Sequence, residues 1–458
     1  MRKSRWPYLV VLLMLAVCSC LYAKDFSILD VDLELYNEQI ETVRKNPVRI
    51  TLLDDQGQPA ENALVKADQI SHQFLFGNAP EYLIFVHAQT FYSRGRRFGI
   101  RPLPPEKVEE YKKLYLEIFN MATLPSFYWA DYEPIQNRLR LLDASKEIAN
   151  WLNENGIPVK GHTLVWGNPP SVGVPGWAHA MGLREEWEEL GEYLFRRVRR
   201  EVEEFKGLVQ MWDVVNEPIV QPWFDDMDLN YIADSFRLVK EIDPSAVTIL
   251  NEFGVLVNSS IRRRFINLAQ DLLDENVPID VIGAEAHIFN AQDIISQLGS
   301  LNAIYRAIDE LAALGKPIHI SEFQIPLPAV IDAFGVSIAE AEILQAEIAR
   351  IFYTVFFSHP AVEVITYWNF YRAWQEGSGL LRDDLSLKPL FHELKRLIHD
   401  EWRTVIQAES DSSGTIDFRG FAGRYEISVE YGEKTREFVI EVNQGESNEF
   451  TLILNYDD

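Results

Sequence analysis

Short apolar runs alternate with longer, helically patterned segments over residues 74–402. The apolar runs lie at 74–77, 118–121, 159–166, 211–216, 247–251, 281–286, 317–320 and 364–368. Between them, stretches such as 183–205 and 338–357 repeat their apolar residues at helical spacing. This alternation predicts βα units in a parallel sheet. Eight such units over about 330 residues favour a closed (β/α)8 TIM barrel over an open sheet.

Two segments with strand-like alternation of apolar and polar residues flank this predicted barrel. Residues 24–73 predict a helix followed by two short strands, at 48–52 and 63–67, and the turn-rich residues between the strands suggest a β-hairpin. Residues 410–458 predict a C-terminal β segment. Its expected strands lie at 425–431, 437–442 and 449–454. Neither segment is large enough to bury a core alone, so we expect both ends to join in one small accessory β-sandwich of about five strands.

Residues 1–23 predict an export signal. Three basic residues precede the apolar run 8–17, which is too short to span a bilayer, and no later segment is apolar enough to do so. The only cysteines, Cys18 and Cys20, end this run, so no disulfide is expected in the mature protein. Cleavage after Ala23 would give a secreted or periplasmic protein. The residues before Cys20 also loosely resemble a lipoprotein signal, so lipid anchoring at the cell surface is the alternative.

The charge and aromatic content of the chain limit the classes of molecule that it can bind. The sequence has 43 Lys and Arg against 69 Asp and Glu, a net charge of −26. Such a chain repels nucleic acid and anionic lipid, whereas a neutral substrate is unaffected. Aromatic residues make up 12%, with 11 Trp, which suits stacking on sugar rings but is also compatible with core packing. No protein partner is implied.

The predicted strands end in acidic and polar residues. Glu217 follows the apolar run 211–216, and Glu322 ends the strand that begins near residue 317. In a barrel, both side chains reach the mouth formed by the C-terminal strand ends. Glycoside hydrolysis needs such a pair, because one carboxyl group protonates the leaving oxygen while the other attacks the sugar or activates water. The alternative, two unrelated solvated loop residues, is weaker for the pair than for either residue alone.

A third strand end adds Glu285 and His287, which alternation places on one face of their strand. Together with Glu322 they could form a mixed nitrogen and oxygen metal site. Only one histidine is available there, and no second lies at metal-binding spacing. We therefore expect a catalytic site without a metal, and the sequence implies no cofactor.

Several motifs together resemble the retaining β-1,4-xylanases of glycoside hydrolase family 10. They are Gly-His-Thr-Leu-Val-Trp at 161–166, Trp-Asp-Val-Val-Asn-Glu-Pro at 212–218, the strand end at His287, the nucleophile position at Glu322, and Gly-Leu-Leu at 379–381. The resemblance covers most of the predicted barrel. It implies that Glu217 is the acid/base, Glu322 the nucleophile, Asn216 a partner of the sugar 2-hydroxyl, and His287 a support for Glu322. Further candidate substrate-binding or supporting residues are His162, Trp166, Trp129, Asn251, Trp368 and Trp374.

Two departures from the family concern the carboxylates. The family has Gln where this chain has Glu285, and Asp where it has Gln324. We expect Glu285 to lie beside Glu217 and, as a second carboxylate, to keep Glu217 protonated to higher pH. Alternatively, Glu285 hydrogen-bonds His287 in place of the missing Asp.

Two further departures concern sugar recognition. Gly167 stands where the family has His, and this glycine is expected to open space beside Trp166 for a substituted sugar. The stretch 123–129 lacks the Asn and Lys with which the family grips the sugar, leaving Ser126 and Tyr128 as polar groups. We expect weakened glycone binding as a result.

The sequence therefore predicts a retaining, endo-acting glycoside hydrolase of xylan or a related plant cell-wall polysaccharide. The alternative is a carbohydrate-binding protein on a family 10-like barrel that has lost turnover. Both Glu217 and Glu322 are present, and binding alone would not require the pair.

Overall fold

A computed structural model describes residues 26–87, 104–169, 171–227, 229–372 and 374–455 of the chain. The predicted export signal lies outside these residues. Within the described residues, no helix combines the length and apolar character needed to cross a membrane.

Eight parallel strands close into the predicted barrel, in the order β10-β3-β4-β5-β6-β7-β8-β9. The strands are β3 (Leu75–Ala79), β4 (Met121–Leu124), β5 (Val159–Trp166), β6 (Met211–Asn216), β7 (Val247–Glu252), β8 (Val281–His287), β9 (Ile318–Gln324) and β10 (Val362–Asn369). The second strand begins at Met121, where the predicted strand ended. The apolar residues just before it, Ile118 and Phe119, are bonded instead to the end of the preceding helix, through the carbonyl of Tyr115.

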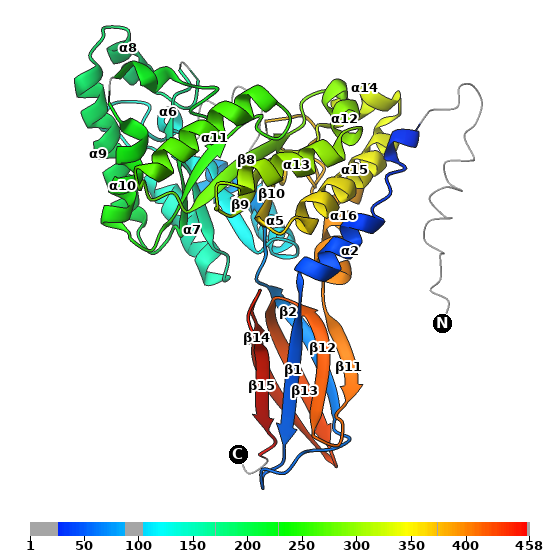
Figure 1. Cartoon of the computed structure of the whole chain (residues 1–458). Helices are drawn as coiled ribbons and strands as arrows, with labels where there is room; N and C mark the ends of the chain where they lie inside the picture. Colours follow the sequence, from blue (N-terminus) through cyan, green and yellow to red (C-terminus); the bar gives the residue numbers. More distant parts are fainter. Residues whose placement is uncertain (1–25, 88–103, 170, 228, 373, 456–458) are drawn as a thin grey trace.

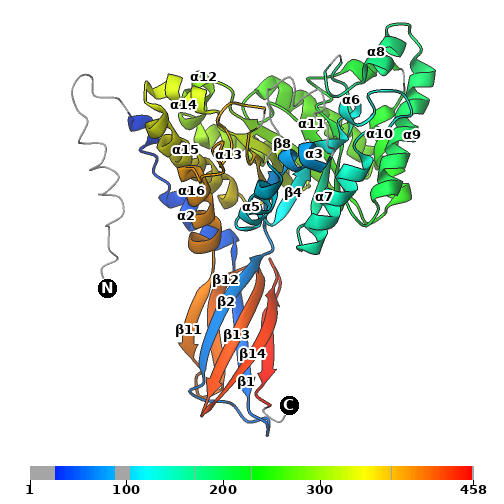
Figure 2. The same cartoon turned by 180° about the vertical axis from the view of Figure 1, so that it is seen from behind.

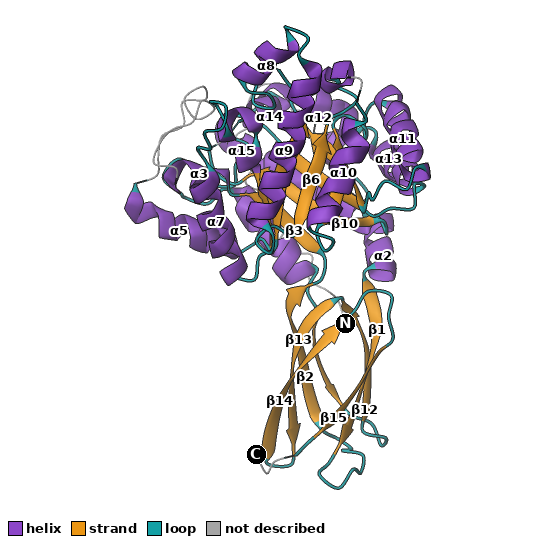
Figure 3. Ribbon diagram, turned by 90° about the vertical axis from the view of Figure 1, so that its left-hand side faces the viewer, coloured by secondary structure: helices purple, strands orange, loops and turns teal. Residues whose placement is uncertain are grey.

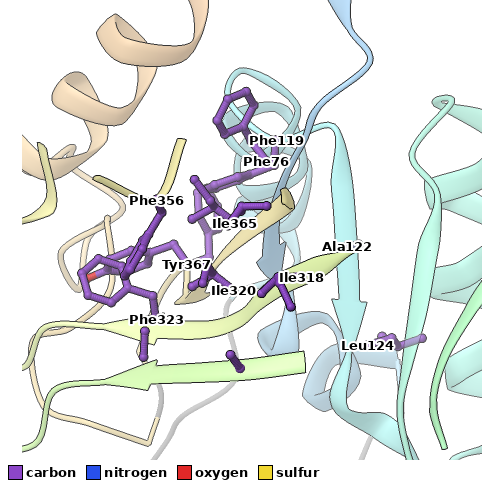
Figure 4. Close-up of a cluster of buried hydrophobic side chains, with 14 of the residues drawn as sticks. Phe76, Phe119, Ala122, Leu124, Ile318, Ile320, Phe323, Phe356, Ile365 and Tyr367 are labelled. Atoms are coloured by element: carbon purple, nitrogen blue, oxygen red, sulfur yellow. The ribbon is translucent and has the colours of Figure 1, made fainter. Parts of the chain in front are cut away.

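Helices surround the barrel, as the cartoon shows from three sides (Figures 1, 2 and 3). The longer ones are α5 (Pro105–Leu116), α7 (Leu142–Glu154), α9 (Trp187–Phe205), α10 (Tyr231–Ile242), α11 (Ser259–Asp274), α13 (Leu301–Ala312) and α15 (Ile338–Ser358). The shorter ones are α2 (Glu34–Val43), α3 (Glu81–His87), α6 (Trp129–Tyr132), α8 (Gly176–Gly182), α12 (Ala291–Leu298), α14 (Leu327–Phe334) and α16 (Pro389–Arg396). Figure 4 shows part of the core between strands and helices, where Phe323 packs against Phe356 and Tyr367 at ring distances of 5.8 and 5.7 Å.

The two chain ends form one β-sandwich of seven strands, two more than expected. One sheet has the order β12-β1-β15 and the other the order β11-β2-β13-β14. The strands are β1 (Lys45–Leu53), β2 (Leu64–His72), β11 (Val405–Glu409), β12 (Thr415–Phe421), β13 (Gly423–Tyr431), β14 (Lys434–Val442) and β15 (Asn448–Ile453). The C-terminal β segment thus begins at Val405, before the predicted 410.

The predicted N-terminal hairpin is wrong. β1 pairs with β12 and β15, whereas β2 pairs with β11 and β13, so the two strands lie in opposite sheets. The physical reason is that both strands bury an apolar face in the same small core. Ile50 of β1 and Val65 of β2 are fully buried there, and the connection between the strands crosses from one sheet to the other.

The sandwich lies against the N-terminal ends of the barrel strands, below the barrel in Figure 1. Arg44, immediately before β1, anchors it there. Its guanidinium group donates to the carbonyl oxygens of Phe357 and Val362, each at 2.7 Å, and of His359 at 2.5 Å. The sandwich does not cover the opposite, C-terminal mouth of the barrel.

Candidate active site

A pocket of about 670 Å³ opens at the C-terminal ends of the barrel strands. The predicted site residues that line it are His162, Trp166, Asn216, Glu217, Glu285, His287, Glu322, Trp368 and Trp374. They come from five strands and from the loop after β10, so the fold gathers residues that are up to 212 positions apart in the chain.

Glu217 directly follows β6 and occupies a left-handed conformation, with φ of 51°. Few residues that bear a side chain adopt this conformation, which is common at functional sites. Its carboxyl group accepts a hydrogen bond from Trp166 Nε1 at 3.0 Å, and Glu285 and Gln221 line the same pocket. Burial, followed by the charge of Glu322, raises the pKa of Glu217 to about 7. A carboxyl group of this kind can hold a proton near neutral pH and release it, as a general acid must.

Glu322 lies in β9, and its surroundings favour the ionised carboxylate rather than the protonated form. Its Oε2 atom lies 3.1 Å from His287 Nε2, and its Oε1 atom lies 3.3 Å from Asn251 Nδ2 and 3.8 Å from His162 Nε2. Burial acts to raise its pKa, but His162 and the hydrogen bond with His287 outweigh it and lower the pKa of Glu322. Glu322 is therefore ionised, as a nucleophile must be.

Two buried charged residues, Lys160 and Asp213, hold His162 beside Glu322. Lys160 Nζ lies 3.0 Å from Asp213 Oδ2, which in turn lies 2.7 Å from His162 Nδ1. All of these side chains are almost fully buried. Lys160 and Asp213 were not predicted as site residues, although two charged residues inside otherwise apolar strands are a signal of a buried polar site.

Asn251, at the end of β7, joins the neighbouring strand ends without lining the pocket. Its Nδ2 atom lies 2.7 Å from Asn216 Oδ1 and 3.0 Å from Glu285 Oε1, in addition to the contact with Glu322. The predicted site residue is thus a supporting group that fixes β6, β8 and β9 relative to one another.

The effect of Glu285 on the pKa of Glu217 differs from the one expected from the sequence. Burial and then the charges of Glu322 and Glu217 raise the pKa of Glu285 well above its usual range, so Glu285 itself keeps the proton. Its hydrogen bond lowers the pKa of Glu217, and the neighbouring charge that raises it is that of Glu322. The expected direction of the effect on Glu217 was therefore wrong. The alternative partner, His287 Nε2, lies 3.7 Å from Glu285 Oε2, a longer contact than its 3.1 Å to Glu322.

Glu285, His287 and Glu322 also place one ligand atom each within 4.8 Å of one another, a spacing that could hold a metal ion. They offer a single nitrogen ligand. His287 and Glu322 are already joined by a hydrogen bond, so these two side chains have a partner without a metal ion. A site without a metal stays a prediction.

Besides Asn251, two predicted site residues lie outside the pocket. Trp129 is buried, donates its Nε1 to Glu133 Oε2 at 3.2 Å and packs edge-on against Trp177. Gln324 is also buried, and its Oε1 atom accepts a hydrogen bond from Asn369 Nδ2 at 2.6 Å. Both side chains are held by structural contacts, which the sequence pattern could not distinguish from contacts with a substrate.

The expectation that Gly167 opens space beside Trp166 is wrong, and Ser126 does not line the pocket, whereas weakened glycone binding stays a prediction. A Cβ atom at Gly167 would lie 2.6 Å from the backbone oxygen of Gln221, so the chain after Glu217 fills the space that the glycine was expected to open. Ser126 is fully buried and outside the pocket, which leaves Tyr128 as the lining residue from this stretch.

Aromatic residues that follow the strand ends complete the pocket. Phe253, Phe289 and Trp374 form a continuous wall, with successive ring centroids 5.6 Å apart. The two phenylalanines were not predicted as site residues, although each lies one or two residues beyond a polar strand end. The further lining residues that were not predicted are Asn168, Ser171, Val172, Val220 and Gln221.

A TIM barrel whose mouth holds two carboxyl groups with opposed proton affinities is the arrangement of a glycoside hydrolase. The model of glycosyl hydrolase family 10 matches residues 88–395. The chain belongs to this family.

The similar proteins include a xylanase and a solved xylanase structure, as well as an anti-sigma factor. The chain is 26% identical over 415 residues to the anti-sigma-I factor RsgI6 of Acetivibrio thermocellus, covering 89% of this chain but only 48% of that protein. It is 28% identical over 312 residues to endo-1,4-beta-xylanase B of Thermotoga neapolitana, covering 64% of this chain and 84% of that one. Xylanase 10B from Thermotoga petrophila RKU-1, solved in complex with xylobiose, superimposes with a TM-score of 0.56 at 25% identity, covering 72% and 95%. The chain thus spans about half the length of the first relative.

Proposed function

We propose that this glycoside hydrolase is a retaining endo-β-1,4-xylanase. The observation that carries the proposal is the divergence of two buried carboxyl groups in one pocket. The pKa of Glu217 is raised to about 7, while that of Glu322 is lowered. Two carboxyl groups whose environments separate their proton affinities are suited to the roles of acid and nucleophile.

The reaction follows from these two states. Glu217 donates its proton to the leaving glycosidic oxygen while the Glu322 carboxylate attacks the anomeric carbon, forming a covalent glycosyl-enzyme. Glu217, now ionised, removes a proton from an incoming water molecule, which displaces Glu322 and restores both groups. His287 and Asn251 hold Glu322 in line for attack through the hydrogen bonds described above.

The choice of polymer rests on the relatives. Endo-1,4-beta-xylanase B and the xylobiose complex of xylanase 10B support β-1,4-linked xylan as the substrate. The aromatic wall of Phe253, Phe289 and Trp374 offers apolar faces on which sugar rings can stack.

Release of reducing sugar from xylan, mixed-linkage glucan and mannan tests the proposal. Xylan should be cleaved fastest, with long oligosaccharides appearing first, as internal cutting requires. A Glu322→Gln variant, which keeps the shape of the side chain, is the control for contaminating activity. Binding of xylan without any release of sugar would instead support the carbohydrate-binding alternative.

We also propose that the protein is exported, on the strength of the signal-like residues 1–23. Amino-terminal sequencing of the mature protein should begin at Lys24 if the signal is cleaved after Ala23. Incorporation of labelled fatty acid that disappears in a Cys20→Ser variant would instead show lipid anchoring. Recovery of the intact chain, Met1 included, from the cytosol would contradict export.

A further inference from the structure

Glu252, the last residue of β7, is a fully buried carboxyl group that does not line the pocket. A buried carboxyl group is costly unless it is hydrogen-bonded. Its Oε1 atom accepts a hydrogen bond from Phe253 N at 2.9 Å, and its Oε2 atom accepts one from Ile219 N at 2.7 Å. Both donors are backbone groups, so Glu252 joins the turn after β6 to the residue that follows β7.

The turn that Glu252 holds begins with Glu217 and ends with Gln221. Glu217 has a φ of 51°, a left-handed conformation that is unfavourable for a residue with a side chain. Its N–H donates to the carbonyl oxygen of Asn251 at 2.8 Å, and its own carbonyl oxygen accepts a hydrogen bond from Gln221 N at 2.8 Å. Ile219 is the middle residue of the turn, so its bond to Glu252 ties the turn to β7 at a second point.

A further contact confines the turn at its end. A Cβ atom at Gly167 would lie 2.6 Å from the backbone oxygen of Gln221, so the backbone of the turn packs directly on this glycine. The preceding residue, Trp166, donates its Nε1 to Glu217 Oε2 at 3.0 Å. The path of the turn and the direction of the Glu217 carboxyl group are therefore fixed together.

We propose that Glu252 is a positioning residue that holds the turn after β6 and so keeps the Glu217 carboxyl group within hydrogen-bond reach of the glycosidic oxygen. An unfavourable backbone conformation persists only where the surrounding contacts fix it, and Glu252 supplies one of these contacts. A general acid must lie close to the oxygen that it protonates, and a displacement of about 1 Å can cost about 100-fold in rate. The inference rests on the proposed acid/base role of Glu217.

The test is a Glu252→Gln variant, which keeps the size of the side chain and removes one acceptor. Burial raises the pKa of Glu252 to about 8, but the ionised and the protonated carboxyl group both offer an oxygen to each N–H. The amide of Gln has a single oxygen, so its NH2 group would face the N–H of either Ile219 or Phe253, donor against donor. The turn should shift to relieve this contact and should carry Glu217 with it.

The readout is kcat/KM for two aryl xylobiosides, measured well below pH 7 so that Glu217 is protonated in every variant. Phenyl xylobioside has a poor leaving group that needs the general acid, whereas the leaving group of dinitrophenyl xylobioside does not need it. In Glu252→Gln, kcat/KM should fall about 10-fold to 100-fold for the phenyl substrate and less than about twofold for the dinitrophenyl substrate. A role in folding alone would lower both rates by the same factor.

Glu201→Gln is the matched control, because Glu201 is a fully buried carboxyl group on α9 that pairs with Arg200 outside the pocket. It should leave the ratio of the two kcat/KM values unchanged, whatever its effect on melting. Glu252→Asp keeps both oxygens on a shorter side chain, so it should change the ratio in the same direction as Glu252→Gln by a smaller factor. This variant decides the test if Glu252→Gln does not fold.

An unchanged ratio in the folded variant would overturn the inference, and so would an equal loss of rate on the two substrates. A wild-type protein that cleaves neither aryl xylobioside nor any polysaccharide would instead overturn the proposed function. The wild type is measured before the variants, so the two failures are distinguishable.

Discussion

The two mouths of the barrel hold cavities of similar size and different character. The C-terminal pocket measures about 670 Å³ and the cavity between the N-terminal strand ends and the sandwich about 580 Å³. Both are lined by histidine, carboxyl groups and aromatic rings. Size and residue types alone would therefore not tell a functional site from a structural one.

The difference lies in how the buried charges are balanced. At the N-terminal mouth, Arg44 has three backbone acceptors and lies over the rings of Phe74 and Phe357, at 4.7 and 5.0 Å. Burial lowers its pKa to about 10, so it stays charged, and lowers that of His319 to about 3, so this histidine stays neutral. At the C-terminal mouth, carboxyl groups face one another and their proton affinities diverge. Carboxyl groups that the fold holds close together despite their repulsion are typical of a functional site, and they lie at the C-terminal mouth.

The largest expected effect separates the mouths directly. Glu322→Ala should lower kcat by about 10⁴-fold or more, because the nucleophile is lost, while xylan binding in affinity electrophoresis persists. Glu363→Ala removes a carboxyl group that lines the opposite cavity and should leave kcat within about twofold. Equal losses in the two variants would remove the distinction between the mouths.

The next prediction assigns the roles within the C-terminal mouth. In Glu217→Ala, an aryl xylobioside whose leaving group needs no acid still forms the glycosyl-enzyme, and azide can attack this intermediate without a general base. Added azide should therefore restore turnover of that substrate and yield a β-glycosyl azide. In Glu322→Ala, azide takes the place of the nucleophile and should yield the α-anomer. NMR spectroscopy of the two products checks the assignment, and exchanged anomers would reverse it.

The N-terminal mouth should respond in stability rather than in rate. Arg44→Met leaves three buried carbonyl groups without their donor and should cost about 2–4 kcal/mol in the free energy of unfolding, measured by urea denaturation. Arg49→Met, in β1, removes an exposed ion pair with Asp417 of β12 and should cost less than about 1 kcal/mol. The kcat of folded Arg44→Met should equal that of the wild type; a large loss would mean that this mouth contributes to catalysis.

The smallest effect concerns Glu285. Activity requires protonated Glu217, so kcat/KM should fall as pH rises through about 7. Glu285→Gln keeps a neutral donor beside Glu217 and should leave this limb nearly in place. Glu285→Ala removes the donor and should move the limb upward. A downward shift in Glu285→Gln would restore the expectation that Glu285 raises the pKa of Glu217.

The parts of the molecule that repeat a pattern could be predicted from the sequence. The barrel follows from the alternation of apolar runs and helices, and Glu217 and Glu322 follow from their places at strand ends. The predicted N-terminal hairpin was wrong because the alternation of apolar and polar residues shows which face a strand buries but not which strand it pairs with. Gly167 was misjudged because the space beside a glycine depends on a segment about 50 residues further on, at Gln221.

The configuration of the first product tests the central claim most directly. If Glu217 and Glu322 act as acid/base and nucleophile of a double displacement, NMR spectroscopy during xylan hydrolysis should show new reducing ends that are β at first and become α only by mutarotation. New reducing ends that are α at first would show single displacement with inversion and would contradict the proposed mechanism.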